Sequence, residues 1–176
     1  MKKIGWLVLL LSLSACGFTP LYVEKTGGSF YYDGKFDATI ADEMSKIKVS
    51  SISERFGQEV RNSLLDLLTP KGVPQEASYF LTVSVADREV SQQAMRSDVT
   101  ATNERIRYLV KYELRSQTET LVSGDSIAFV SYDILANPFS TTMAQKKAES
   151  DAAKIVANDI VLRIGAYFHS QKRSEE

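Results

Sequence analysis

The sequence predicts an α+β fold in which two helices pack on one face of a mixed or antiparallel sheet of about four strands. Residues 105–115 alternate apolar and polar side chains, which is typical of a strand with one buried face. Residues 56–68 and 152–168 instead repeat apolar side chains at spacings of three and four, which indicates amphipathic helices. The predicted order is β-α-β-β-β-α, and this order favours helices gathered on one face of the sheet.

The first predicted strand is residues 46–52, "KIKVSSI", where apolar and polar residues alternate. Ser51 or Ser53 is expected to cap the helix that follows, with Glu54 in its first turn. The apolar stripe of this helix consists of Phe56, Val60, Leu64, Leu67 and Leu68. The sequence "TPKG" at residues 69–72 predicts where the helix ends.

Three further strands are predicted, over residues 79–95, 105–115 and 120–135. Within residues 120–135, Ser123-Gly124-Asp125 predicts a bulge or kink, because glycine inside a strand often marks one. In the middle strand the side chains expected to face the core are Ile106, Tyr108, Val110, Tyr112 and Leu114. Its other face is largely polar, as in an antiparallel sheet with one solvated side.

Asn137-Pro138 predicts the end of the last strand, and helical spacing begins at about Thr141. The apolar stripe of the closing helix consists of Ala152, Ala153, Val156, Ile160, Ile164, Tyr167 and Phe168. The charged side chains expected to remain in water are Lys146, Lys147, Glu149, Asp151, Lys154 and Arg163. Residues 170–176 are predicted to be a frayed polar tail.

The first residues have the three parts of a bacterial export signal. Lys2 and Lys3 precede a short apolar run, and Ser14 and Ala15 form a small-residue cleavage site before Cys16. A lone cysteine cannot form an internal disulfide or a thiolate metal site, so Cys16 is a buried thiol, a reactive thiol or a point of covalent modification. The sequence Leu-Ser-Ala-Cys that ends at Cys16 looks like a lipobox, the bacterial lipoprotein signal.

That resemblance implies that the sulfur of Cys16 carries a diacylglyceryl group and that the cleaved amino terminus is acylated. Two or three acyl chains anchor a protein stably to a membrane. Gly17, rather than aspartate, follows the cysteine, and this favours the periplasmic face of the outer membrane. The predicted organisation is a signal peptide at residues 1–15, an arm at 16–44, one domain at 45–169 and the tail at 170–176.

Composition restricts the possible partners of the mature chain. Without residues 1–15 the 176-residue chain has 161 residues, which is the length of one domain. Removing Lys2 and Lys3 leaves 19 basic against 22 acidic side chains, a formal charge of −3 that gives no reason to expect nucleic acid as a partner. The aromatic group at residues 30–36 is expected to pack on the domain or on a partner.

No motif in the sequence indicates catalysis. His169 is the only histidine and lies near the carboxyl terminus, so a histidine triad or a zinc site has few candidate residues. There is no phosphate-binding loop, nucleophile elbow or dinucleotide fingerprint. We therefore expect a binding protein rather than an enzyme, with no cofactor and no metal.

Several stretches together resemble the LptE family of lipopolysaccharide-assembly lipoproteins. These are the Cys-Gly-aromatic start at 16–18, "EVRNSLLDLL" at 59–68 with Gly72-Val73 after it, "RYLVKYELR" at 107–115, and residues 131–164. The resemblance implies a lipoprotein that plugs and helps to assemble the LptD β-barrel of the outer membrane, and takes part in lipopolysaccharide insertion. Its implied partners are that barrel, lipopolysaccharide and the membrane.

Lipopolysaccharide is polyanionic, so the resemblance also implies basic contact residues. The candidates are Arg96, Lys146 and Lys147, with Arg105, Arg107 and Arg88 as weaker ones. Each is equally consistent with an ordinary solvated charge. Two other functions remain open: a pilotin-like adaptor for another barrel or secretin, and a lipid-anchored hydrolase, for which the sequence offers no candidate residue.

Overall fold

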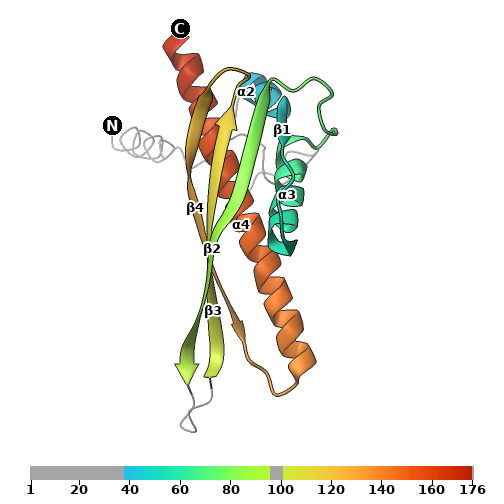
Figure 1. Cartoon of the computed structure of the whole chain (residues 1–176), viewed down its shortest axis with the longest axis vertical. Coiled ribbons are helices and arrows are strands. Elements are labelled where there is room, and N and C mark those ends of the chain that lie inside the picture. The colour runs from blue at the N-terminus through green and yellow to red at the C-terminus, as the bar shows by residue number, and fades with distance from the viewer. Residues whose placement is uncertain (1–37, 96–100, 176) are drawn as a thin grey trace, which may run out of the picture. The chain divides into compact units, whose positions relative to one another are not determined.

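The computed structural model describes residues 38–95 and 101–175, which form three helices and four strands (Figure 1). In chain order they are α2 (Ala38–Ser45), β1 (Ile47–Val49), α3 (Arg55–Leu68), β2 (Tyr79–Met95), β3 (Ala101–Arg115), β4 (Thr120–Asp133) and α4 (Pro138–Glu175). From β1 onward this is the predicted β-α-β-β-β-α order, so the α+β fold class is confirmed. Helix α2 was not predicted.

The four strands form one mixed sheet in the order β1-β2-β3-β4. Strand β1 runs parallel to β2, and the other neighbouring pairs are antiparallel. Two parallel neighbours need a crossover connection, and α3 supplies it. A bulge between Val85 and Asp87 shifts the register of β2 against β3. This extra residue turns Arg88 toward the helices and turns Asp87 and Glu89 toward the opposite, outward face.

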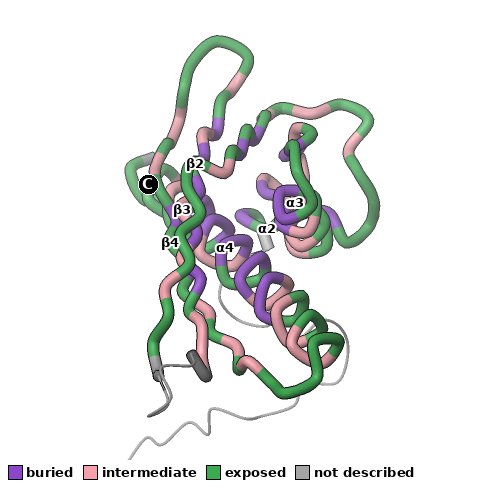
Figure 2. Tube along the Cα trace, turned by 60° about the horizontal axis from the view of Figure 1, so that its bottom comes forward, coloured by how far each residue is buried: buried purple, intermediate pink, exposed green. Residues whose placement is uncertain are grey.

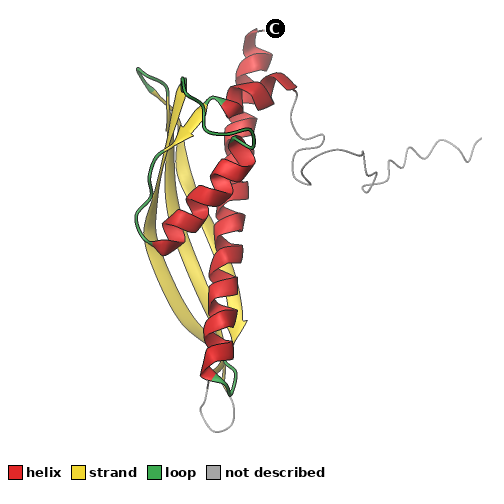
Figure 3. Ribbon diagram, turned by 90° about the vertical axis from the view of Figure 1, so that its right-hand side faces the viewer, coloured by secondary structure: helices red, strands yellow, loops and turns green. Residues whose placement is uncertain are grey.

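The helices cover one face of the sheet, and the core lies between them and the strands (Figure 3). The five β3 side chains predicted to face the core are all buried, at 0–4% exposure. Within the described part of the chain, the two aromatic rings that lie closest are those of Phe56 of α3 and Tyr108 of β3, which stack with ring centroids 3.7 Å apart. Buried residues form a continuous stripe along α4, where Ala152, Ala153 and Ala157 let the helix approach its neighbours closely (Figure 2).

Helix α2 belongs to the core despite its eight residues. Ile40 and Met44 are 3% and 2% exposed. The Tyr79 hydroxyl donates a hydrogen bond to Glu43 Oε2 at 3.0 Å, and the Tyr79 ring meets Phe168 of α4 edge-on. Two helical turns carry too few apolar residues for a periodic signal, and so short a helix depends on packing for its stability. For this reason the sequence pattern did not reveal it.

The predicted serine cap of α3 is wrong. The residue before the helix is Glu54, which has a φ of 68° and makes no capping hydrogen bond with its side chain. The start of α3 is held instead by Gln58, whose Nε2 donates to the Ile52 carbonyl oxygen at 2.6 Å. Ile52 packs so closely on Gly57 that a Cβ there would lie 2.5 Å from Ile52 Cγ2. Short-range contacts of Ile52 with Gly57 and Gln58, rather than a serine cap, therefore decide this helix start.

The predicted bulge at Ser123-Gly124-Asp125 is also wrong. Strands β3 and β4 pair without interruption from Asn103 with Asp133 to Leu114 with Val122. Gly124 instead makes room for its cross-strand neighbour, because a Cβ at this position would lie 2.9 Å from the hydroxyl oxygen of Tyr112. Glycine here accommodates a buried aromatic side chain rather than a backbone irregularity.

Helix α4 is longer than predicted. It begins at Pro138 rather than near Thr141, and it continues through residues 170–175, for which a polar tail was predicted. Asn137 caps its start, since Asn137 Oδ1 accepts a hydrogen bond from the Phe139 N–H at 2.9 Å. Proline at the first helical position is favourable because its nitrogen has no hydrogen to leave unpaired.

Candidate functional site

Of the candidate basic residues, Lys146, Lys147 and Arg105 lie toward the end of the domain that is farther from α2. We call this the distal end; it comprises the converging ends of β2 and β3, the end of β4, residues 134–137 and the first three turns of α4 (Figure 1). Helix α2 and the carboxyl end of α4 lie at the other end. The first described residue, Ala38, begins α2 and therefore lies away from the distal end.

Exposed apolar side chains gather along the turn into α4. Thr141 Oγ1 accepts a hydrogen bond from the Leu135 N–H at 2.9 Å, which holds the turn against the helix. Leu135, Phe139 and Met143 nevertheless have 48%, 72% and 47% of their surface exposed. We call these three residues the distal apolar cluster. Phe139 and Met143 lie one helical turn apart on the same side of α4, and Leu135 lies in the turn before the helix.

Lys146 and Lys147 follow this cluster on α4, and the structure distinguishes between them. Lys147 Nζ lies 2.8 Å from Asp151 Oδ2, one helical turn later. Lys146 is exposed and makes no ion pair with the described residues. Arg96 lies outside the described residues. Lys146 is therefore the better candidate for an anionic ligand on this helix.

Arg105 and Arg107 both lie on the outward face of β3, away from the helices. Arg107 is already neutralised, with Asp87 Oδ2 at 2.8 Å from Nη2 and Glu89 Oε2 at 3.0 Å from Nε. Arg105 is exposed and has no ion pair within the described part of the chain. Of these two arginines, Arg105 retains an unbalanced positive charge.

Arg88 faces inward and binds Glu149, which was predicted to remain in water. That prediction is wrong: Glu149 is 6% exposed. Glu149 Oε1 lies 3.4 Å from Arg88 Nη2 and 3.1 Å from Gln145 Nε2, and Glu149 Oε2 accepts a hydrogen bond from Arg55 of α3. One carboxylate thus joins α3, β2 and α4. Arg88 also donates to the Tyr108 hydroxyl at 3.1 Å, so its role is structural.

Tyr132 and Glu104 face each other across β4 and β3 near the distal end. The Tyr132 hydroxyl donates a hydrogen bond to Glu104 Oε2. Burial of the phenol, and next this hydrogen bond to a carboxylate, raise the pKa of Tyr132 to about 12. Tyr132 therefore remains neutral at physiological pH and acts as a hydrogen-bond donor.

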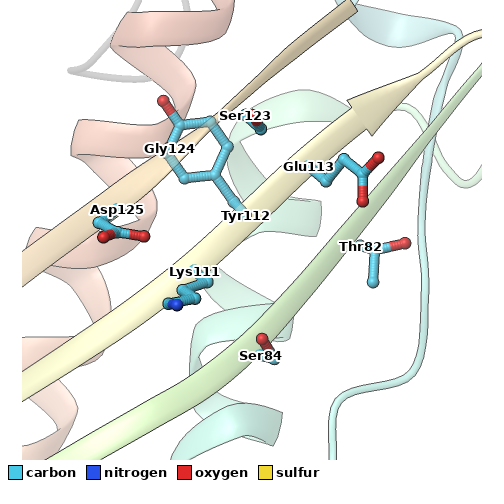
Figure 4. Close-up of a pocket in the computed structure, with 8 residues that line it drawn as sticks. All are labelled: Thr82, Ser84, Lys111, Tyr112, Glu113, Ser123, Gly124 and Asp125. Carbon is cyan, nitrogen blue, oxygen red and sulfur yellow. The ribbon is translucent and has the colours of Figure 1, made fainter. Parts of the chain in front are cut away.

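The outward face of the sheet has a shallow, polar depression of about 410 Å³ (Figure 4). It lies over β2, β3 and β4, where small side chains leave space between larger ones. Its lining residues are Thr82, Ser84, Lys111, Tyr112, Glu113, Ser123, Gly124 and Asp125. The depression is open, and most of its lining side chains carry hydroxyl or charged groups.

Among residues 38–95 and 101–175, no group of histidine, cysteine, aspartate and glutamate side chains could hold a metal ion. No helix within these residues is both long and apolar enough to cross a membrane. Cys16, the candidate lipidation site, lies outside the described residues.

The domain has the fold of a class of bacterial lipoproteins. A lipoprotein from Caulobacter crescentus superposes with a TM-score of 0.63 at 24% identity, covering 76% of this chain and 98% of the other. Rare lipoprotein B from Shewanella oneidensis gives 0.56 at 11% identity, with 72% and 98% covered. A minor lipoprotein from Acinetobacter baumannii gives 0.51 at 16% identity, with 69% and 92% covered. At these identities the likeness concerns the fold alone.

The sequence of the chain, rather than its fold, identifies the family to which it belongs. Residues 44–164 match the model of the LptE lipopolysaccharide-assembly family, and this segment covers more than half of the chain. The chain therefore belongs to the LptE family, as the resemblance of its motifs indicated. A comparison with curated proteins finds no match.

Proposed function

We propose that this lipopolysaccharide-assembly protein is an outer-membrane lipoprotein that plugs and helps to assemble an LptD-type β-barrel. In this role it takes part in the insertion of lipopolysaccharide into the outer leaflet. The observation that carries the proposal is the family match over residues 44–164, which includes the sheet and most of α4. The proposal also assigns Cys16 as the lipidated residue and the barrel as the principal partner.

The outward face of the sheet supports the idea of a plug. A plug must present a polar surface to the polar lumen of a barrel. The outward side chains of β3 include Arg105, Lys111 and Arg115, and those of β2 include Thr82 and Ser84. Hydroxyl and charged groups of this kind can exchange their water for hydrogen bonds with lumenal side chains.

The distal end supports contact with lipopolysaccharide. The anionic groups of lipopolysaccharide require cations that are not already neutralised by a carboxylate. This requirement favours Lys146 and Arg105 over Lys147 and Arg107. The distal apolar cluster beside Lys146 offers a surface for acyl chains. Arg96 remains a further candidate because it belongs to the segment that connects β2 and β3.

Co-purification tests the principal partner. The full chain would carry a carboxyl-terminal tag, be extracted in detergent and be compared with its Cys16→Ala variant. We expect one large β-barrel at stoichiometric amount with the wild type. Recovery of the barrel with Cys16→Ala as well would assign the lipid to delivery rather than to the contact. A secretin instead of a barrel, or neither protein, would contradict the proposal and favour a pilotin-like adaptor.

Binding of purified lipopolysaccharide tests the distal residues separately. The change Lys146→Glu should weaken binding by at least about fivefold, because it replaces an unpaired cation with an anion. Lys147→Glu is the matched control: it makes the same change one residue away, at a lysine already paired with Asp151. A larger effect for Lys147→Glu, or no effect for Lys146→Glu, would refute this assignment.

A further inference from the structure

Helix α2 joins the two ends of the described chain. It is the first described element, and it packs against α4 near the carboxyl end of that helix (Figure 3). Lys172 Nζ donates a hydrogen bond to Thr39 Oγ1 at 3.5 Å, which links α2 to the last turns of α4. Residues 38–43 and 165–175 both lie outside the segment that matches the family. Two parts of the chain on either side of that segment therefore meet here.

The apolar part of this contact consists of few side chains. Ile40 and Met44 are buried on α2, and Phe168 is buried on α4. The ring of Tyr79, the first residue of β2, meets Phe168 edge-on with ring centroids 5.1 Å apart. Helix α3, in comparison, buries four large apolar side chains. Because stabilisation increases with the apolar area that is buried, α2 is held less firmly than α3.

Glu43 makes the polar part of the contact. Its Oε2 accepts a hydrogen bond from the Tyr79 hydroxyl group at 3.0 Å, and its Oε1 lies 2.7 Å from Lys46 Nζ. Lys46 Nζ also lies 3.0 Å from Asp42 Oδ2. The pairs with Lys46 are local and partly exposed, so they contribute little to docking. The hydrogen bond of Glu43 with Tyr79 connects α2 to the sheet.

Helix α2 has little local support of its own. Its first turn contains no acidic residue and its last turn no basic residue, so its ends lack charges that complement the helix dipole. Isolated helices shorter than about 12 residues are marginal in water. An eight-residue helix that loses its contacts with Tyr79 and Phe168 is therefore expected to unfold. Docking and folding of α2 thus occur together.

Strand β1 depends on the same contact. A single residue, Lys46, separates α2 from β1. Strand β1 is an end strand with three residue pairs to β2, and the first pair is Ile47 with Tyr79. Tyr79 therefore holds α2 with its hydroxyl group and the start of β1 with its backbone N–H, which donates to the Lys46 carbonyl oxygen at 3.4 Å. Terminal elements are poorly ordered unless they are tied down, and α2 ties down β1.

We propose that α2 is a strap that opens as a unit while α3, the other strands and the rest of α4 remain folded. The closed strap holds the chain that leads to Cys16 against the carboxyl end of α4. As a helix α2 spans about 12 Å, whereas residues 38–46 in extended form span up to about 31 Å. The two states give the domain two distances from an anchor at Cys16. This consequence rests on the proposed lipidation of Cys16, but the opening itself does not.

Hydrogen–deuterium exchange, measured residue by residue with NMR, tests the strap. The mature chain is produced without residues 1–15 and with Cys16→Ala, so the result does not depend on the lipid. The backbone N–H groups of residues 42–45 are the hydrogen-bonded part of α2. We expect their protection to be at least about 100-fold lower than that of β3, because local opening leaves β3 folded. Equal protection of α2 and β3 would mean that α2 opens only with the whole domain, which would overturn the proposal.

Three variants test the contacts that hold the strap. Tyr79→Phe removes the hydroxyl group and keeps the ring, so the protection of residues 42–45 should fall about fivefold while that of β3 is unchanged. Met44→Ser removes a buried side chain, and the protection of residues 42–45 and of β1 should fall together by at least about tenfold. Met143→Ser is the matched control. It makes the same replacement at a half-exposed position near the start of α4 and should change neither value.

Three results with these variants would overturn the proposal. They are loss of protection throughout β3 in Met44→Ser, unchanged exchange in Tyr79→Phe, and a strand β1 that stays protected after α2 opens. A barrel that fails to co-purify would contradict the proposed function and leave these exchange rates as they are. The two failures are therefore distinguishable.

Discussion

Replacement of Glu149 by glutamine should destabilise the domain more than any other exchange of a charged residue on α4. The carboxylate receives hydrogen bonds from Arg55 and Arg88, which come from α3 and β2, and from Gln145 of its own helix. Glutamine keeps the size of the side chain and one carbonyl oxygen. It loses the negative charge that balances the two arginines.

The expected loss of stability is about 2 kcal/mol. A hydrogen bond between charged groups contributes about 1.5–3 kcal/mol when it is buried. The side chains of Arg55 and Arg88 are 54% and 42% exposed, so water can replace much of the hydrogen bonding that they lose with the carboxylate. The two hydrogen bonds together therefore contribute less than twice the value for one buried bond. Glu149 itself is 8% exposed in its side chain, so the loss is not removed entirely.

The assay is urea unfolding of the mature protein, followed by far-UV circular dichroism. Asp151→Asn is the matched control, because it removes an acid from α4 whose partner, Lys147, is 75% exposed, and it should cost at most about 0.5 kcal/mol. In a double-mutant cycle, Glu149→Gln and Arg88→Met should couple by about 1 kcal/mol. Equal losses for Glu149→Gln and Asp151→Asn, or no coupling with Arg88, would refute the reasoning.

Three further predictions concern single positions. Gly124→Ala should cost about 1–3 kcal/mol in urea unfolding, because the new Cβ would meet the buried ring of Tyr112; a neutral result would show that the ring moves freely. Gly72→Ala should cost about 1 kcal/mol for a different reason, since Gly72 has a φ of 112° with no atom near its missing Cβ. Tyr132 has its pKa raised from 10.0 to about 12, so the folded state retains a proton that the unfolded chain releases. The stability that Tyr132 contributes is complete below pH 10 and declines as the pH rises toward 12. Tyr132→Phe should therefore flatten that decline in the unfolding midpoint, and an unchanged decline would contradict the raised pKa.

The elements with a clear period were predictable from the sequence. The alternation of β3 identified its buried face residue by residue, because a strand has only two faces. The stripe of α3 was predictable from its helical period, and its end near Thr69 from the proline and glycine that follow. Glu149 was also within reach of the sequence: it lies four residues before Ala153 and seven before Val156, which places it on the buried stripe of α4. Its charge led to the wrong interpretation.

Other features depend on contacts between distant residues. Arg105 and Arg107 occupy equivalent positions in the alternation of β3, so the sequence could not separate them. The difference arises in β2, where the bulge after Val85 directs Asp87 and Glu89 to the face of Arg107. The start of α3 differs, because it is decided by short-range contacts of Ile52 with Gly57 and Gln58. No capping residue or apolar period in the sequence indicates these contacts.

Helix α4 limits how the length of this chain can change during evolution. Its 38 residues span about 57 Å at 1.5 Å per residue. Insertion of one residue between Glu149 and Ile164 would rotate the two halves of the helix by about 100° relative to each other. Either the half after the insertion would turn its alanines away from the sheet, or the half before it would turn Glu149 away from Arg55 and Arg88. Homologues with this fold should therefore vary in length at residues 70–78 and 116–119 and keep α4 in phase.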